Sequence, residues 1–361
     1  MNEVTLADVE AIAIGAGVLG TGGGGNTYMG KIWLKRELKE RGGCVQIIQA
    51  DEVADDDFLC SLGTMGAPTV SNEKPMQGDE LVNIVRALEH HTHEKVKAII
   101  IGEIGGSNSL KPLIAGLQLG LPVIDGDAMG RAFPELQMDT FSIGGVPHHP
   151  MALGDSYGNV VIFHQLDSAL RAEQYGRTLT IDMGGSAALG MPVMHGRDMK
   201  KHLIRNTLSL TKKIGDVVLA ARKKNTEPSD EIAELCKGHV LFRGKISDVE
   251  RRTVKGFARG RMTITAFGNS NDKLELVFQN ENLIAWHNGD IVATVPDLIT
   301  LLNLEDGEPI GTEMLRYGLR VAVLGMPAPK ELKTEKALEV VGPKAFGYPE
   351  ITFAPMPGNL L

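Results

Sequence analysis

Three polar loops in the N-terminal half of the sequence carry side chains that could do acid–base chemistry. The loops span residues 63–69, 102–108 and 125–135, and each follows directly on an apolar segment. If these segments are parallel strands, their loops meet at one edge of a sheet, which is where open α/β sheets bind ligands. We therefore expect one crevice that gathers Thr64, Glu103, Asn108, Asp125, Asp127, Arg131 and Glu135.

Four of these residues are the predicted catalytic set. Carboxyls can donate and accept protons, so Asp127, Glu135 and Glu103 are candidate general acids and bases. Arg131 offers a planar guanidinium that can neutralise a substrate carboxylate. The set therefore favours an anionic small molecule as the substrate.

A run of four glycines at residues 22–25, followed by Asn26, is a second candidate binding element. Glycine permits a positive φ and lets other groups lie against bare backbone. We expect the run to join two helices, at about 6–19 and 27–41, and to turn its amides toward the same crevice, where they could cradle an anion. The predicted substrate-binding residues are Gly23, Gly24, Gly25, Asn26, Thr64, Asn108 and Asp125.

Residues 15–20 match G-x-G-x-x-G, the dinucleotide fingerprint, which requires a strand before it and a helix after it. Here the match lies at the end of a predicted helix. A Walker A lysine is also missing, because Asn26, Thr27 and Tyr28 follow the glycine run. Both features disfavour a nucleotide site. An enzyme that uses residues 15–25 as a phosphate cradle remains an alternative, which nucleotide-induced thermal stabilisation would favour.

Two histidines are candidate metal ligands. His148 lies in a loop between two prolines, and His195 follows a segment of small and apolar residues. The H-E-x-x-H and C-x-x-C motifs are absent, so no local motif predicts a metal site. We expect a site assembled from separate loops, in which Asp127, His148 and His195 bind a divalent metal ion, with zinc as the favoured metal.

Alternating apolar strands and amphipathic helices predict an α/β fold. Residues 1–165 should form a mostly parallel sheet with helices on both faces. Residues 166–361 should form an α+β domain with a small antiparallel β subdomain at about 237–296, where the apolar period changes to two and Asn288-Gly289 predicts a hairpin. Within this half we also expect a strand at 178–182 and one long helix at about 198–223.

Composition excludes several classes of protein. The net charge of −8 argues against nucleic-acid binding. No uncharged apolar stretch approaches the roughly 20 residues needed to cross a bilayer, and the N-terminus has no signal-peptide pattern. Three irregularly spaced cysteines fit a reducing compartment. We expect a cytoplasmic homo-oligomer that binds neither membranes nor nucleic acid.

Four motifs, taken in order, resemble the S-methyl thiohydantoin desulfurase family. They are Leu-Gly-Thr-Gly-Gly-Gly-Gly-Asn at 19–26, Glu-Ile-Gly-Gly-Ser-Asn-Ser at 103–109, the block Asp-Gly-Asp-Ala-Met-Gly-Arg-Ala-Phe-Pro-Glu-Leu-Gln-Met at 125–138, and Val-Gly-Pro-Lys-Ala-Phe-Gly-Tyr at 341–348. The resemblance covers about residues 5–355, and the block at 125–138 is its most specific part.

The resemblance implies cleavage of a carbon–sulfur bond in a hydantoin-like ring, with a bound metal ion. Members of this family often accompany hydantoinase/oxoprolinase-type proteins, so such a partner is expected too. As a hypothesis, metal-bound water adds to the ring carbon that bears sulfur, Asp127 or Glu135 acts as general base, and the thiol leaves. A non-catalytic subunit of a hydantoinase/oxoprolinase-type partner is the remaining alternative.

Overall fold

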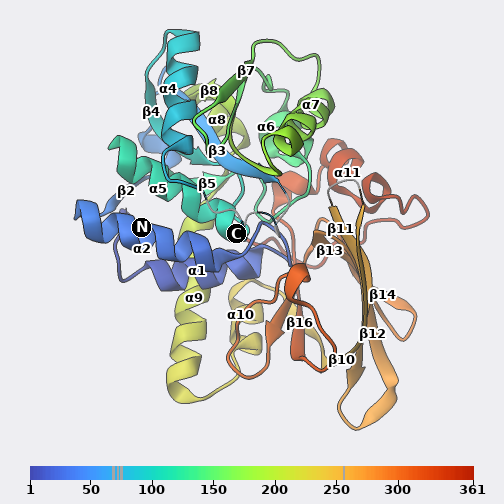
Figure 1. Ribbon diagram of the computed structural model, residues 1–361. Coiled ribbons are helices and arrows are strands. Elements are labelled where there is room, and N and C mark those ends of the chain that lie inside the picture. Colours follow the sequence, from blue (N-terminus) through green and yellow to red (C-terminus); the bar gives the residue numbers. More distant parts are fainter. Residues whose placement is uncertain (67–69, 71–72, 74–75, 255–256) are drawn as a thin grey trace.

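The computed structural model describes residues 1–66, 70, 73, 76–254 and 257–361. The fold is mixed α/β, as predicted, with one sheet of parallel central strands among helices and a second, curled antiparallel sheet (Figure 1). The first sheet comes mainly from the N-terminal half, and the second comes from residues 239–326. The last three residues of the polar loop expected at 63–69 lie outside the described residues.

Parallel strands form the centre of the first sheet, where β2, β5, β4 and β3 pair in that order. Antiparallel strands extend the sheet at both margins. Across the sheet the strands are β1 (Glu3–Val4), β2 (Val45–Ile48), β5 (Val123–Asp127), β4 (Val96–Ile101), β3 (Phe58–Gly66), β8 (Ser186–His195), β6 (Met151–Gly154) and β7 (Val160–Phe163), with β9 (Ile204–Arg205) beside β5. β8 lies beyond the expected domain boundary at residue 165, yet it is part of this sheet.

Helices cover both faces of this sheet because its central strands are apolar on both sides. From β4, Ile99 and Ile101 belong to one core with side chains of α4 (Glu80–Thr92) and α5 (Leu110–Leu119). Ala98 and Ile100 face the other way, in a core with α6 (Thr140–Gly144) and α8 (Gly196–His202).

The first helices support the glycine run. α1 (Val9–Leu19) and α2 (Thr27–Arg41) flank it, and the side chain of Asn26 caps α2 by accepting a hydrogen bond from the N–H of Tyr28 at 2.8 Å. α1 packs closely against α9 (Thr207–Lys224), since a Cβ on Gly15 would lie 1.8 Å from the carbonyl oxygen of Thr211. Gly15, the first glycine of the apparent dinucleotide fingerprint, therefore allows two helices to pack closely.

Two local predictions were wrong. The strand expected at 178–182 is the end of α7 (Ala169–Asp182), in which Ala172, Gly176 and Thr180 are buried at helical spacing. The long helix expected at 198–223 is interrupted between α8 and α9. Asn206 adopts φ +64° there, and β9 pairs with β5 just before it. Both predictions relied on local β propensity and apolar content, and tertiary contacts override these local preferences.

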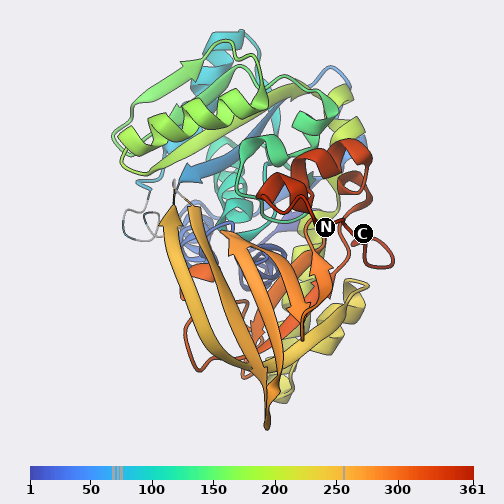
Figure 2. The same cartoon turned by 90° about the vertical axis from the view of Figure 1, so that its right-hand side faces the viewer.

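The second sheet is larger than the subdomain predicted at 237–296, and it curls beside the first (Figure 2). Its strands, in spatial order, are β14 (Asp290–Thr294), β13 (Glu281–His287), β12 (Asn269–Gln279), β11 (Phe257–Ala266), β10 (His239–Val254), β16 (Arg320–Met326) and β15 (Leu298–Asn303). The hairpin expected at Asn288-Gly289 joins β13 to β14, and both turn residues have positive φ. The tight turn at Asn280, between β12 and β13, reaches the N-terminal part of the fold, where the N–H of Asn282 donates to the carbonyl of Thr21.

Short helices complete the chain. Two of them are the α-helices α10 (Ser229–Leu235) and α11 (Glu335–Val341). The others are 3-10 helices: η1 (Ala50–Glu52), η2 (Gly106–Ser109), η3 (Leu136–Met138), η4 (Thr312–Met314), η5 (Lys330–Leu332) and η6 (Pro343–Phe346). In the part of the chain that the structure describes, no helix has both the length and the apolar character needed to cross a membrane.

Candidate active site

A cavity of about 310 Å³ lies at the carboxyl ends of β3, β4 and β5. This volume is at the lower end of the range for small-molecule sites, roughly 300–1,000 Å³. Its wall includes residues of the glycine run and α2, the β3 end, η2, the loop after β5, β8 and the β12–β13 turn. The cavity therefore lies where the two sheets approach each other.

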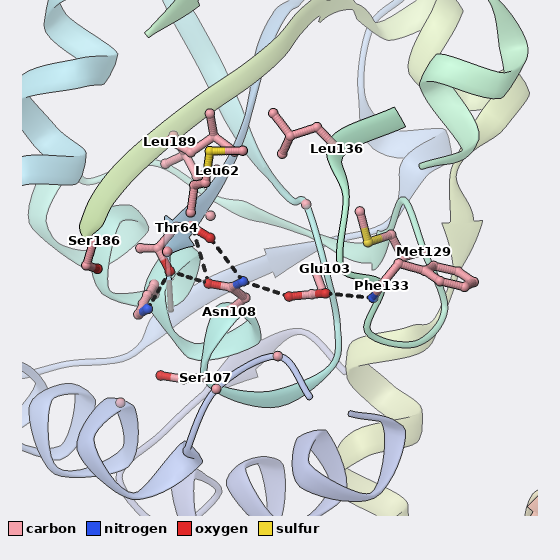
Figure 3. A pocket seen from close by; sticks show the side chains of 18 of the residues that line it. Leu62, Thr64, Glu103, Ser107, Asn108, Met129, Phe133, Leu136, Ser186 and Leu189 are labelled. Atoms are coloured by element: carbon pink, nitrogen blue, oxygen red, sulfur yellow. Dashed lines mark hydrogen bonds between the residues drawn. The ribbon is translucent and has the colours of Figure 1, made fainter. Parts of the chain in front are cut away.

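Four polar side chains form a continuous hydrogen-bonded chain along the cavity wall. Lys111 Nζ donates to Thr64 Oγ1 at 2.6 Å, and Thr64 Oγ1 donates to Asn108 Oδ1 at 2.7 Å. Asn108 Nδ2 donates to Glu103 Oε2 at 2.6 Å, and the other oxygen of Glu103 accepts from the N–H of Phe133 at 3.0 Å. We call Lys111, Thr64, Asn108 and Glu103 the polar chain. Figure 3 shows Asn108 between Thr64 and Glu103, with Leu62, Leu136 and Leu189 also on the cavity wall.

Neighbouring elements bring the polar chain together. Thr64 lies near the end of β3, and Glu103 comes just after β4, which is parallel to β3. Asn108 lies on η2, and Lys111 lies in the first turn of α5, which follows η2 directly. Asn108 also accepts from the N–H of Thr64 at 3.2 Å, so its amide holds both the backbone and the side chain of that residue.

Burial shifts the ionisation of both ends of the polar chain toward neutral pH. Loss of solvent raises the pKa of Glu103 to about 7, assisted by the negative charge of Asp127 and opposed by the hydrogen bond from Asn108. Loss of solvent also lowers the pKa of Lys111 to about 8, although the carboxylates of Glu103 and Glu80 oppose that change. A carboxyl and an amine that both titrate near pH 7–8 are suited to proton transfer.

Part of the glycine run lies on the cavity wall, at Gly24, Gly25 and Asn26. Gly24 has φ +72°, and a Cβ there would lie 2.2 Å from the carbonyl oxygen of Gly105. Gly23 lies outside the lining, and a Cβ on it would meet the carboxyl of Glu281 at 1.9 Å. The run thus makes a turn with positive φ and also lets other groups pack against bare backbone.

Two of the predicted acids serve the scaffold. Asp127 is fully buried outside the cavity lining, and its Oδ2 accepts from the N–H groups of Ile104, Met129 and Gly130 at 2.8–2.9 Å. It therefore fixes the loops that follow β4 and β5. Asp125 is also fully buried outside the lining, and it accepts from the N–H of Ser209 at 3.0 Å. Glu135 does line the cavity.

Arg131 is fully buried and joins the two halves of the molecule. Its Nε donates to the carbonyl of Ala132, and its two terminal nitrogens donate to Thr21 Oγ1 and to the carbonyls of Asn282, Pro296 and Asp297, all at 2.8–3.1 Å. These bonds occupy all five N–H donors of a guanidinium. The arrangement leaves no donor for a substrate carboxylate, so the role expected for Arg131 is replaced by a structural one.

The expected metal ligands do not meet. His148 Nε2 lies 2.8 Å from Ser142 Oγ, and His195 Nε2 lies 3.0 Å from Glu94 Oε2. Neither histidine lines the cavity. Among the described residues, no group of three or more His, Cys, Asp and Glu side chains is placed to hold a metal ion. The donor set of Asp127, His148 and His195 does not fit a bound zinc ion.

Lys111 and Glu281 are ionisable residues of the cavity that were not predicted from the sequence. Lys111 carries a signal of its own, because it is the only charged residue in α5, a helix that directly follows the loop of Glu103 and Asn108. Glu281 carries none, since the β12–β13 turn brings it from a distant part of the chain. It is 2% exposed, and burial together with the negative charge of Glu103 raises its pKa well above the usual range.

Comparison with known proteins finds family matches to both halves of the chain. Family models described as S-Me-THD-like match it twice, the N-terminal domain at residues 7–165 and the C-terminal domain at residues 167–356. A crystal structure of a protein from Chromobacterium violaceum has the same fold, with a TM-score of 0.80 at 23% identity, over 98% of this chain and 100% of that one. No protein of curated function matches the sequence.

Proposed function

This chain belongs to the S-Me-THD-like family, and from that premise we propose that it hydrolyses the carbon–sulfur bond of an S-substituted, hydantoin-like ring. The family itself suggests hydantoin-related enzyme chemistry. We propose the reaction, its substrate and the catalytic role of the polar chain.

One observation carries the proposal. Glu103 lines a cavity of substrate size, its pKa is raised to about 7, and it is linked through Asn108 to a hydroxyl and an amine. A carboxyl that exchanges protons near neutral pH can protonate a ring nitrogen and later take up a proton from water. This assigns to Glu103 the role that the sequence had suggested for Asp127 or Glu135.

The proposed reaction consumes one water. In the substrate the ring carbon bears sulfur and is doubly bonded to a ring nitrogen. Addition of water across that bond gives a tetrahedral carbon, and a proton moves to the nitrogen. The carbon–sulfur bond then breaks with its electron pair on sulfur, which leaves as the thiol. The ring carbon keeps the oxygen as a carbonyl beside an N–H, so the products are a hydantoin and a thiol.

The cavity suits a planar ring with one polar edge. The polar chain offers donors and acceptors on one part of the wall, while Leu62, Met129, Phe133 and Leu189 contribute apolar surface. Small-molecule sites commonly combine a mainly apolar lining with a few convergent polar groups. A hydantoin-like ring has apolar faces and hydrogen-bonding edges, which match this lining.

Hydrolysis of S-methyl thiohydantoin in water enriched in ¹⁸O tests the proposal. We expect methanethiol and hydantoin in equal amounts, with the label in the hydantoin carbonyl that replaces sulfur. Glu103→Gln should lower kcat by about 10²–10⁴-fold, the usual contribution of a general acid–base. Wild-type protein that yields neither product at any pH between 6 and 9 would contradict the proposed reaction.

A further inference from the structure

Thr64 has the surroundings of an activated nucleophile. Its hydroxyl lines the cavity and contacts an amine on one side and an amide oxygen on the other, at 2.6 and 2.7 Å. Asn108 is itself held by Glu103, which turns the amide oxygen of Asn108 toward Thr64. A hydroxyl within hydrogen-bonding distance of a base, with a third group that orients it, is the arrangement found in covalent catalysis.

We propose that Thr64 attacks the ring carbon and forms a covalent ring–enzyme intermediate, with Lys111 as its base. This inference rests on the proposed function and specifies how that reaction proceeds. Water then hydrolyses the intermediate in a second step, so the overall products stay the same.

The proposed base is positioned for this role. Lys111 Nζ and Thr64 Oγ1 are 2.6 Å apart, and a neutral amine at this distance accepts the hydroxyl proton in place of donating one. The pKa of Lys111, lowered to about 8 by burial, makes the neutral amine accessible near physiological pH. Lysine–serine and related pairs use the same logic in other hydrolases.

Both steps balance. In the first, the Thr64 proton moves to the Lys111 amine, and Thr64 Oγ1 bonds to the ring carbon. The carbon–sulfur bond breaks with its electron pair on sulfur, and the sulfur takes the proton from Lys111 and leaves as the thiol. In the second, the oxygen of water bonds to the same carbon, and one water proton moves to Lys111, which returns it to Thr64 as the carbon–Oγ1 bond breaks. Glu103 takes up the other water proton and gives a proton to the ring nitrogen, so the carbon keeps a carbonyl beside an N–H.

A ring with a better leaving group makes the intermediate observable. An S-(4-nitrophenyl) substituent speeds the first step and leaves the second unchanged, so the intermediate accumulates. We expect acid quenching during turnover, followed by mass spectrometry, to find the ring without its thiol on the peptide that contains Thr64. Thr64→Ser should keep the adduct, and Thr64→Val should lack it.

Rates of thiol release complete the test. We expect Thr64→Val to lose at least about 1,000-fold and Thr64→Ser to stay within about tenfold of wild type. Thr178→Val, the same substitution at an exposed helical position, controls for the change of residue type. Unmodified wild-type enzyme during turnover of the nitrophenyl ring, or Thr64→Val above a tenth of the wild-type rate, would overturn the covalent step and leave the proposed function intact. Absence of thiol release by wild type would overturn both.

Discussion

Replacing Glu103 with glutamine should change how stability depends on pH. The carboxyl is buried at the cavity wall, and its pKa is raised from 4.5 to about 7. A carboxyl whose pKa is higher in the folded than in the unfolded protein stabilises the fold fully below the unfolded pKa, and this contribution is lost as pH rises through the folded pKa. Between pH 4.5 and 7 the wild-type protein should therefore lose stability on account of Glu103.

The size of this loss follows from the displacement of the pKa. Each whole pKa unit is worth about 1.4 kcal/mol, so Glu103 accounts for a loss of roughly 3 kcal/mol between pH 4.5 and 8. Glutamine cannot ionise and makes no such contribution. The unfolding free energy of Glu103→Gln, relative to wild type, should rise by roughly 3 kcal/mol over this range. Asp127 and Asp139, whose pKa values burial raises to about 7 and about 6, add losses of the same sign in both proteins.

Urea unfolding of both proteins at pH 5, 6, 7 and 8 measures this difference directly. Glu40→Gln, an exposed substitution on α2, corrects for the general effect of removing one negative charge. A gap between wild type and Glu103→Gln that stays constant within about 0.5 kcal/mol would refute the reasoning. The role of Glu103 as a proton donor and acceptor near neutral pH would then lose its physical basis.

Three further outcomes are expected. Arg131→Met should cost about 3–5 kcal/mol of unfolding free energy, because it removes a buried charge and orphans its acceptors, whereas the exposed Arg36→Met should stay within about 0.5 kcal/mol. Gly24→Ala should lower the melting temperature far more than Gly43→Ala, because both glycines have positive φ but, of the two, only Gly24 lies against backbone. Equal losses in the two variants would show that close packing at Gly24 does not contribute. Dialysis against EDTA should leave thiol release within about twofold, because the described residues place no three ligands together, and loss of activity restored by zinc would contradict this.

Local periodicity was enough to predict much of the N-terminal half. The helices expected at about 6–19 and 27–41 correspond to α1 and α2. Failures came where distant contacts decide the local structure. The segment 178–182 has β-forming residues but completes a helix, and β9 interrupts an apolar stretch through its pairing with β5. In the C-terminal half, β15 and β16 extend a sheet that local patterns had limited to 237–296.

The candidate site was only partly accessible from sequence for a related reason. The position of each loop after a strand correctly indicated which segments approach one another, and Thr64, Glu103 and Asn108 lie together on the cavity wall. Sequence does not reveal which way a side chain points. Arg131 and Asp127 were therefore predicted to be catalytic. Both are fully buried outside the cavity lining, where they hydrogen-bond to backbone groups. Lys111 was missed because a lysine on a helix is ordinarily solvated.

The claim that this cavity cleaves carbon–sulfur bonds is tested most directly by thiol release from S-methyl thiohydantoin, measured in parallel for wild type and Glu103→Gln. We predict turnover by wild type, with one hydantoin formed per methanethiol, and a loss of about 10²–10⁴-fold in the variant while it remains folded. Equal rates for the two proteins, or no thiol from wild type, would contradict the account.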